Sequence, residues 1–123
     1  MDIRIKRIYE VPGKDDGYRL LVDRIWPRGM TKEHAHIDAW HKTIGPSTEL
    51  RKWFGHEPVK YAGFRSRYVA ELKKMQDELE RIRELSRIKR VTLVYSAKDE
   101  VHNQAKVLRE VLLDKHINRT IPK

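Results

Sequence analysis

Two short apolar runs that lie far apart in the chain constrain its fold most. The first is Leu20-Leu21-Val22, within residues 18–24, and the second is the segment 91–95, Val-Thr-Leu-Val-Tyr. Apolar runs of this length between charged residues are typical of strands that are buried on both faces. Helical patterns fill much of the chain between the two runs and return after the second. This order of elements predicts an α/β domain in which helices pack on a sheet.

A further strand is predicted near the start of the chain. Isoleucines alternate with charged residues over residues 2–9, which is the pattern of a half-exposed strand. Turn-forming residues at 11–17 separate it from the strand at 18–24. A parallel connection needs about a dozen or more residues, so these two strands are expected to pair antiparallel if they are neighbours. Residues 1–123 are therefore expected to form a single domain with a small Rossmann-like or flavodoxin-like mixed sheet.

One long amphipathic segment is predicted to form the crossover helix, over about residues 58–88. Pro58 suits the first helical position, and apolar side chains then recur at spacings of three and four. They are Tyr61, Phe64, Tyr68, Leu72, Met75, Leu79, Ile82 and Leu85. This stripe is expected to face the core, with coiled-coil pairing as the alternative.

Shorter helices are predicted on either side of this segment. Ser47 is a good N-cap and Gly55 a good stop for a helix at 48–54. Asp99 is expected to cap a last helix. The apolar stripe of that helix is Val101, Ala105, Leu108 and Leu112. The tail at 116–123 either adds a short edge strand or hangs free.

The charge balance and the absence of cysteine exclude several classes of protein. Lys and Arg number 27 against 18 Asp and Glu, which gives a net charge of +9 over 123 residues. Without cysteine the chain has no disulfide, no thiol nucleophile and no thiolate metal site. No apolar run is long enough to span a membrane, so no membrane partner is expected. The first residues lack the apolar region of a secretory signal, which favours a cytoplasmic location.

Functional side chains are expected where the two buried strands end, because ligands of open α/β sheets bind at the carboxyl ends of parallel strands. The first strand is followed by Asp23, Arg24, Ile25, Trp26, Pro27, Arg28 and Gly29. Arg24 and Arg28 are candidates to bind an anion beside Asp23, and Trp26 is a candidate to stack on a planar ring. The alternative is a structural Asp–Arg pair that holds the loop, with Trp26 in the core.

The second strand leads from Ser96 to Asn103 and into a helix N-terminus. Free N–H groups there, with the hydroxyl of Ser96 and the side chain of Asn103, are suited to bind a phosphate or carboxylate. Asp99 and His102 are the candidate catalytic pair, because imidazole titrates near neutral pH and a carboxylate can orient it. The alternative is that Asp99 is a helix cap and His102 a surface residue. Ser96 lacks the flanking glycines of a nucleophile elbow.

Metal and cofactor sites are not expected. The nearby residues His34, His36, Asp38 and His41 lack the spacing of known metal ligands. The chain has neither a glycine-rich dinucleotide motif nor a P-loop. His56, between two predicted helices, is expected to face the crevice between the strand ends.

Three long motifs occur in one order along the chain, at residues 16–29, 47–56 and 93–103. Together they resemble the YeaO-like branch of the domain-of-unknown-function 488 family over nearly the whole chain. The resemblance implies a shared fold but no reaction, because the family has no assigned activity. Other branches have a Cys-His-Arg triplet where this chain has Val101-His102-Asn103, so activities of those branches are not carried over.

The sequence therefore predicts a domain that binds a small anionic, nucleotide-like ligand between the two strand ends. Arg24 and Arg28 would hold the anion, and Asp99 with His102 would move protons. If the protein is an enzyme, hydrolysis or group transfer is expected, because nothing suggests a redox cofactor. Two alternatives remain open: a non-enzymatic nucleic-acid-binding protein that uses the basic surface, and an interaction module that dimerises through the long helix.

Overall fold

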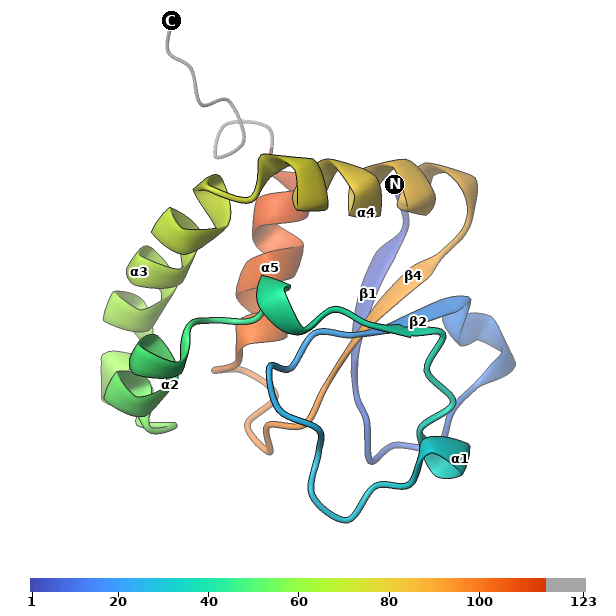
Figure 1. The fold of residues 1–123 in the computed structure, drawn as a ribbon, viewed down its shortest axis with the longest axis horizontal. Helices are drawn as coiled ribbons and strands as arrows, with labels where there is room; N and C mark the ends of the chain where they lie inside the picture. The colour runs from blue at the N-terminus through green and yellow to red at the C-terminus, as the bar shows by residue number, and fades with distance from the viewer. Residues whose placement is uncertain (115–123) are drawn as a thin grey trace, which may run out of the picture.

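The computed structural model describes residues 1–114 as an α/β domain built on a parallel sheet (Figure 1). The strands are β1 (Ile3–Arg7), β2 (Tyr18–Leu21), β3 (Ala39–Trp40) and β4 (Val91–Tyr95). Their order in the sheet is β1-β4-β2-β3, and every neighbouring pair is parallel. The central strand β4 is buried along its whole length, as its apolar sequence predicts. The tail at 116–123, for which the sequence left open an edge strand or a free end, lies outside the described residues.

The prediction of a mixed sheet is wrong. β1 and β2 are not neighbours, because β4 lies between them and pairs with both. Residues 8–17, with a 3-10 turn at Lys14–Asp16, carry the chain back to the start of β2. An extended segment of this length spans the sheet without a helix, so a parallel connection is possible here.

The helices are α1 (Lys32–Ala35), α2 (Thr48–Phe54), α3 (Tyr61–Lys73), α4 (Gln76–Ile88) and α5 (Gln104–Leu113). Two further 3-10 turns lie at Lys42–Ile44 and Pro58–Lys60. The local signals for α2 are confirmed, because the Ser47 hydroxyl accepts a hydrogen bond from the N–H of Leu50 and Gly55 ends the helix with a φ of 53°. No helix among residues 1–114 is long and apolar enough to cross a membrane.

The predicted single helix over 58–88 is divided into α3 and α4. Pro58 begins a 3-10 turn, and the chain leaves helical geometry at Met75, where φ is −117° and ψ is 44°. The apolar stripe continues through the bend with Phe64, Tyr68 and Leu72 buried in α3 and with Leu79 and Ile82 buried in α4. Figure 1 shows that the bend turns α4 across the end of the sheet.

The start of α5 also differs from the prediction. Asn103, and not Asp99, is the N-cap, because its side-chain oxygen accepts a hydrogen bond from the N–H of Lys106. Asp99 instead accepts from the N–H groups of Val101 and His102 in a turn that precedes the helix. Val101 therefore lies outside α5 and is 53% exposed. The remaining predicted stripe residues of α5 are buried.

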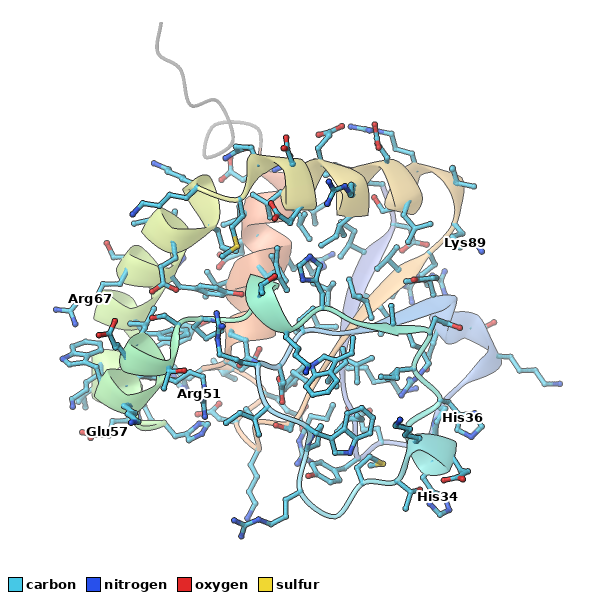
Figure 2. The ribbon with its side chains drawn as sticks, viewed as in Figure 1. His34, His36, Arg51, Glu57, Arg67 and Lys89 are labelled. Carbon is cyan, nitrogen blue, oxygen red and sulfur yellow. The ribbon has the colours of Figure 1, made fainter. Side chains whose placement is uncertain are left out.

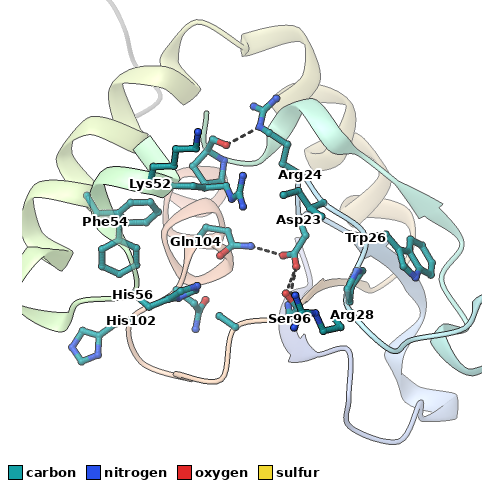
Figure 3. Close-up of a pocket in the computed structure, with 17 residues that line it drawn as sticks. Asp23, Arg24, Trp26, Arg28, Lys52, Phe54, His56, Ser96, His102 and Gln104 are labelled. Atoms are coloured by element: carbon teal, nitrogen blue, oxygen red, sulfur yellow. Dashed lines mark hydrogen bonds between the residues drawn. The ribbon is translucent and has the colours of Figure 1, made fainter. Parts of the chain in front are cut away.

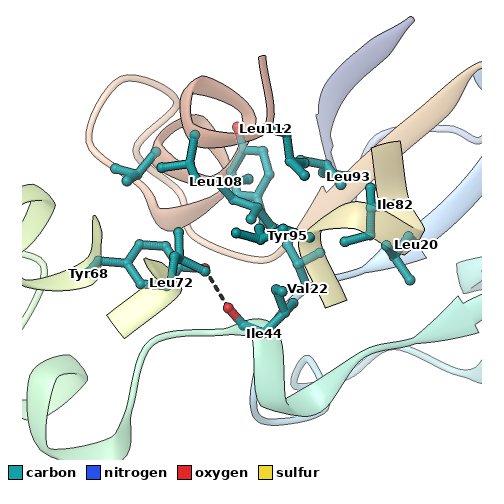
Figure 4. Packing of buried hydrophobic residues seen from close by; sticks show 14 of the residues in the cluster. Leu20, Val22, Ile44, Tyr68, Leu72, Ile82, Leu93, Tyr95, Leu108 and Leu112 are labelled. Carbon is teal, nitrogen blue, oxygen red and sulfur yellow. Dashed lines mark hydrogen bonds between the residues drawn. The ribbon is translucent and has the colours of Figure 1, made fainter. Parts of the chain in front are cut away.

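The two faces of the sheet carry different cores. On one face, helices α2 to α5 pack against Leu20, Val22, Leu93 and Tyr95 in the larger cluster (Figure 4). On the other face, Leu21 and Val94 join a smaller cluster under α1 and the loop that follows β2. The alternation of side chains along each strand produces this division. Because β2 and β4 are parallel neighbours in the sheet, their carboxyl ends lie side by side.

Candidate functional site

A cavity of about 430 Å³ lies at the carboxyl ends of β2 and β4 (Figure 3). Its walls come from the loop after β2, from α2 and the turns at its two ends, from α3, and from the segment between β4 and α5 with the first residue of α5. We call it the strand-end cavity. Eight of the predicted site residues line it: Asp23, Arg24, Trp26, Arg28, His56, Ser96, His102 and Asn103. Asp99 is not among the lining residues.

Asp23 lies at the floor of the strand-end cavity and is only 7% exposed. One carboxylate oxygen accepts hydrogen bonds from the N–H of Ser96, at 3.1 Å, and from the Ser96 hydroxyl. The other accepts from the side-chain amide of Gln104 (Figure 3). Burial raises the pKa of the Asp23 carboxyl above its usual range, although these hydrogen bonds and the nearby charge of Arg51 act in the opposite direction.

Arg24 is held by the protein itself. Its Nε donates to the carbonyl of Pro46 at 2.8 Å, and Nη2 donates to the carbonyl of Gly45 at 2.9 Å. No Asp23–Arg24 ion pair forms among the described residues. Gly45 is required at this point because an added Cβ would lie 2.9 Å from the carbonyl oxygen of Val22. Arg24 therefore fixes the approach of the chain to α2 and has few donors left for a ligand.

Trp26 packs against the smaller hydrophobic cluster, which agrees with the alternative that it is a core residue. Its indole N–H donates to the carbonyl of Met30 at 2.7 Å. The ring packs edge-to-face on Trp40 with the centroids 5.3 Å apart. Trp26 thus touches the cavity from the side of the smaller hydrophobic cluster, with its one polar group already bonded.

Three cationic side chains on the cavity wall are not held by hydrogen bonds. Arg28, Arg51 and Lys52 line the cavity, and the side chain of none of them makes a hydrogen bond or a close ion pair with any residue in 1–114. Figure 2 places Arg51 on α2, well away from His34 and His36 at α1. Sequence reasoning found Arg28 but missed Arg51 and Lys52, because it placed α2 without knowing which face turns toward the strand ends.

Apolar side chains also line part of the cavity. Phe54 and Phe64 stack with their ring centroids 4.4 Å apart, and both line the cavity. Ile25 adds a side chain that is 57% exposed. His56, with a φ of 59°, lines the same side, its ring centroid 6.0 Å from that of Phe54.

The predicted pair Asp99 and His102 forms, with Nδ1 of His102 2.8 Å from the Asp99 carboxylate. Backbone N–H groups of His102 and Val101 and the His102 ring lower the pKa of Asp99 to about 2. The imidazole stands edge-on to Tyr61, with ring centroids 5.1 Å apart. Asp99 therefore positions His102, which itself reaches the cavity wall.

Asn103 has both polar ends engaged in the fold. It is 1% exposed, caps α5 through Oδ1 and donates through Nδ2 to the carbonyl of Asp99 at 2.9 Å. Gln104, which sequence reasoning missed, reaches the cavity floor in its place. Within residues 1–114 no cluster of three or more His, Asp or Glu side chains is placed to hold a metal ion.

Fold and site together define a small parallel α/β domain with a cationic cavity at the carboxyl edge of its sheet. The family model described as the inactive DUF488-N3 subclade matches residues 2–121, and the chain belongs to this subclade. This confirms the resemblance to the YeaO-like proteins.

Two relatives illustrate the membership. The chain is 47% identical over 112 residues to the uncharacterized protein YeaO of Escherichia coli (strain K12), which covers 91% of this chain and 97% of that protein. It is 39% identical over 110 residues to the uncharacterized protein Rv3073c of Mycobacterium tuberculosis (strain ATCC 25618 / H37Rv). This match covers 89% of this chain and 92% of that protein. No solved structure matches the chain, so the Rossmann-like or flavodoxin-like assignment stays a prediction.

Proposed function

We propose that this protein binds a small ligand with a phosphate or carboxylate group in the strand-end cavity. The observation that carries the proposal is the set of Arg28, Arg51 and Lys52, which line the cavity and whose side chains make no hydrogen bond or close ion pair among residues 1–114. Cationic donors of this kind form their strongest hydrogen bonds with carboxylates and phosphates. A cavity of about 430 Å³ suits a small ligand.

The proposed role is binding without a covalent step. The description of the family as inactive supports this choice. The chain has no cysteine, and the Ser96 hydroxyl donates to Asp23 rather than to an imidazole. A hydrolase or transferase that forms a covalent intermediate would need an activated nucleophile in the protein, for which this arrangement offers no support.

The two other functions considered from the sequence have less support. Dimerisation through the long helix would need a free apolar stripe, but Phe64, Tyr68, Leu72, Leu79 and Ile82 are buried in the core. Nucleic-acid binding rests on the net charge alone and stays a prediction. It would differ from the proposed function by a steep loss of affinity in salt.

Titration calorimetry with inorganic phosphate and ethyl phosphate tests the proposal. The wild-type protein is expected to bind, and Arg51→Ala or Lys52→Ala to weaken binding by about tenfold or more, because each removes a charge-assisted hydrogen bond. Lys73→Ala is the matched control, since Lys73 is an exposed cation of α3 that does not line the cavity. Absence of binding, or equal losses in all three variants, would overturn the proposal.

A further inference from the structure

The floor of the strand-end cavity presents acceptor oxygens, whereas its wall presents cations. An ionised carboxylate offers about four acceptor positions, and Asp23 uses two on one oxygen for Ser96 and one on the other for Gln104. One position on the oxygen beside Gln104 is therefore left. A simple anion at this floor would meet the like charge of Asp23.

Gln104 supplies a second acceptor beside the first. Its amide nitrogen donates to Asp23, which fixes the amide with its oxygen as the remaining polar atom. That oxygen has no hydrogen-bond donor in the described part of the chain, and Gln104 lines the cavity. Because the Gln104 amide is bonded to Asp23, its oxygen and the remaining acceptor position of Asp23 belong to one hydrogen-bonded unit, which two donors of a ligand would satisfy.

Hydroxyl donors fit this floor better than an ammonium group does. Arg51 lies near enough to Asp23 for its charge to act on that carboxylate, which weakens the attraction of Asp23 for a second cation. With hydroxyl donors the buried carboxylate would stay hydrogen-bonded on all sides, as buried polar groups generally are.

We propose that the ligand is a phosphorylated polyol such as a sugar phosphate. Its neighbouring hydroxyls donate to Asp23 and Gln104, and its phosphate binds Arg28, Arg51 and Lys52. This inference rests on the proposed function and adds the chemical class of the ligand. Asp23 and Gln104 act as specificity-determining residues that distinguish polyol phosphates from plain phosphate esters.

Two probes separate the polyol from the phosphate. Ribose 5-phosphate carries both groups, and ethyl phosphate carries the phosphate alone. The wild-type protein is expected to bind ribose 5-phosphate about tenfold more tightly, which corresponds to two net hydrogen bonds. Gln104→Met, of similar size, removes one of the two acceptors and is expected to reduce the ratio of the two affinities to about threefold. Gln76→Met, which changes the other glutamine of the chain on α4, is the control and should keep the wild-type ratio.

The outcomes distinguish this inference from the proposed function. Equal affinities for both probes in the wild type, or a ratio that Gln104→Met leaves unchanged, would overturn the polyol assignment and leave anion binding intact. Tighter binding of phosphoethanolamine than of ribose 5-phosphate would overturn it in favour of an ammonium ligand. Failure of every phosphate probe to bind would remove the proposed function itself. Circular dichroism confirms that each variant is folded before titration.

Discussion

Burial determines the chemistry of Asp23. Its neighbour in sequence, Arg24, is bonded to the carbonyls of Gly45 and Pro46, so the carboxylate has no ion-pair partner in residues 1–114. Hydrogen bonds from Ser96 and Gln104 replace the water that burial removes. A buried carboxylate held in this way binds a proton more readily than one in the unfolded chain.

The raised pKa of Asp23 predicts a specific pH dependence of stability. Between the usual pKa of 3.8 and the raised value, the native state holds more protons than the unfolded state. The contribution of Asp23 to the free energy of unfolding is therefore largest when it is protonated and falls as pH rises through that window. Asp23→Asn removes this titration, so the stability of the variant relative to wild type is expected to increase from about pH 4 upward and then level off.

Urea unfolding followed by circular dichroism at several pH values measures this difference. Asp77→Asn, on the exposed side of α4, is the control and should show a smaller dependence. Asp99 titrates with the opposite sign at lower pH, because its pKa is about 2, but it is common to both proteins and cancels in the comparison. A difference that stays constant with pH would contradict the expectation.

At the scale of elements, Ser47 joins two helices. Its hydroxyl accepts from the N–H of Leu50 and so caps α2. The same hydroxyl donates to Glu71 of α3 at 2.7 Å, and the backbone N–H of Ser47 donates to the other Glu71 oxygen at 2.9 Å. This connection orients α2, and with it Arg51 at the cavity wall.

Ser47→Ala is expected to lower the free energy of unfolding by about 1–2 kcal/mol, because it removes both the cap and one bond to Glu71. Ser66→Ala is the matched control, since Ser66 is exposed on α3 and makes no side-chain hydrogen bond within the described residues. Chemical denaturation of the two variants gives the comparison. Equal stability of both would show that the cap contributes nothing.

Local signals were sufficient for some elements and insufficient for others. The strand at 91–95 and the ends of α2 are encoded in adjacent residues, and both predictions are confirmed. The bend at Met75 could not be predicted from periodicity, because the apolar stripe keeps its phase through the bend. The insertion of β4 between β1 and β2 depends on pairing between distant segments, which the short loop at 11–17 does not reveal.

The candidate site was predictable to a similar extent. Polar residues after each buried strand pointed to the edge where the cavity lies, because parallel strands end together. The bonding of Arg24 was not predictable, since the carbonyls that hold it come from the turn before α2. Arg51 and Gln104 were missed because only the packing of α2 and α5 brings them to the strand ends.

For the molecule as a whole, the net charge of +9 predicts weak attraction to nucleic acid that does not depend on the cavity. Affinity for a short DNA duplex, measured by fluorescence anisotropy, is expected to fall by orders of magnitude between about 50 and 200 mM salt. Arg51→Ala and Lys73→Ala should have equally small effects, because each removes one of many cations. Salt-resistant binding that Arg51→Ala abolishes would instead assign nucleic acid to the cavity.

The central place of β4 sets the order in which the chain can fold as it leaves the ribosome. β1 and β2 are synthesised early, but each pairs along its length with β4, which is made late. Among the strands of residues 1–114, the ladder open to the nascent chain until then is the short one between β2 and β3. The apolar faces of the early strands stay uncovered during most of translation, which is the condition in which chaperones are needed. Formation of the two ladders that involve β4 is consequently a late event with high contact order.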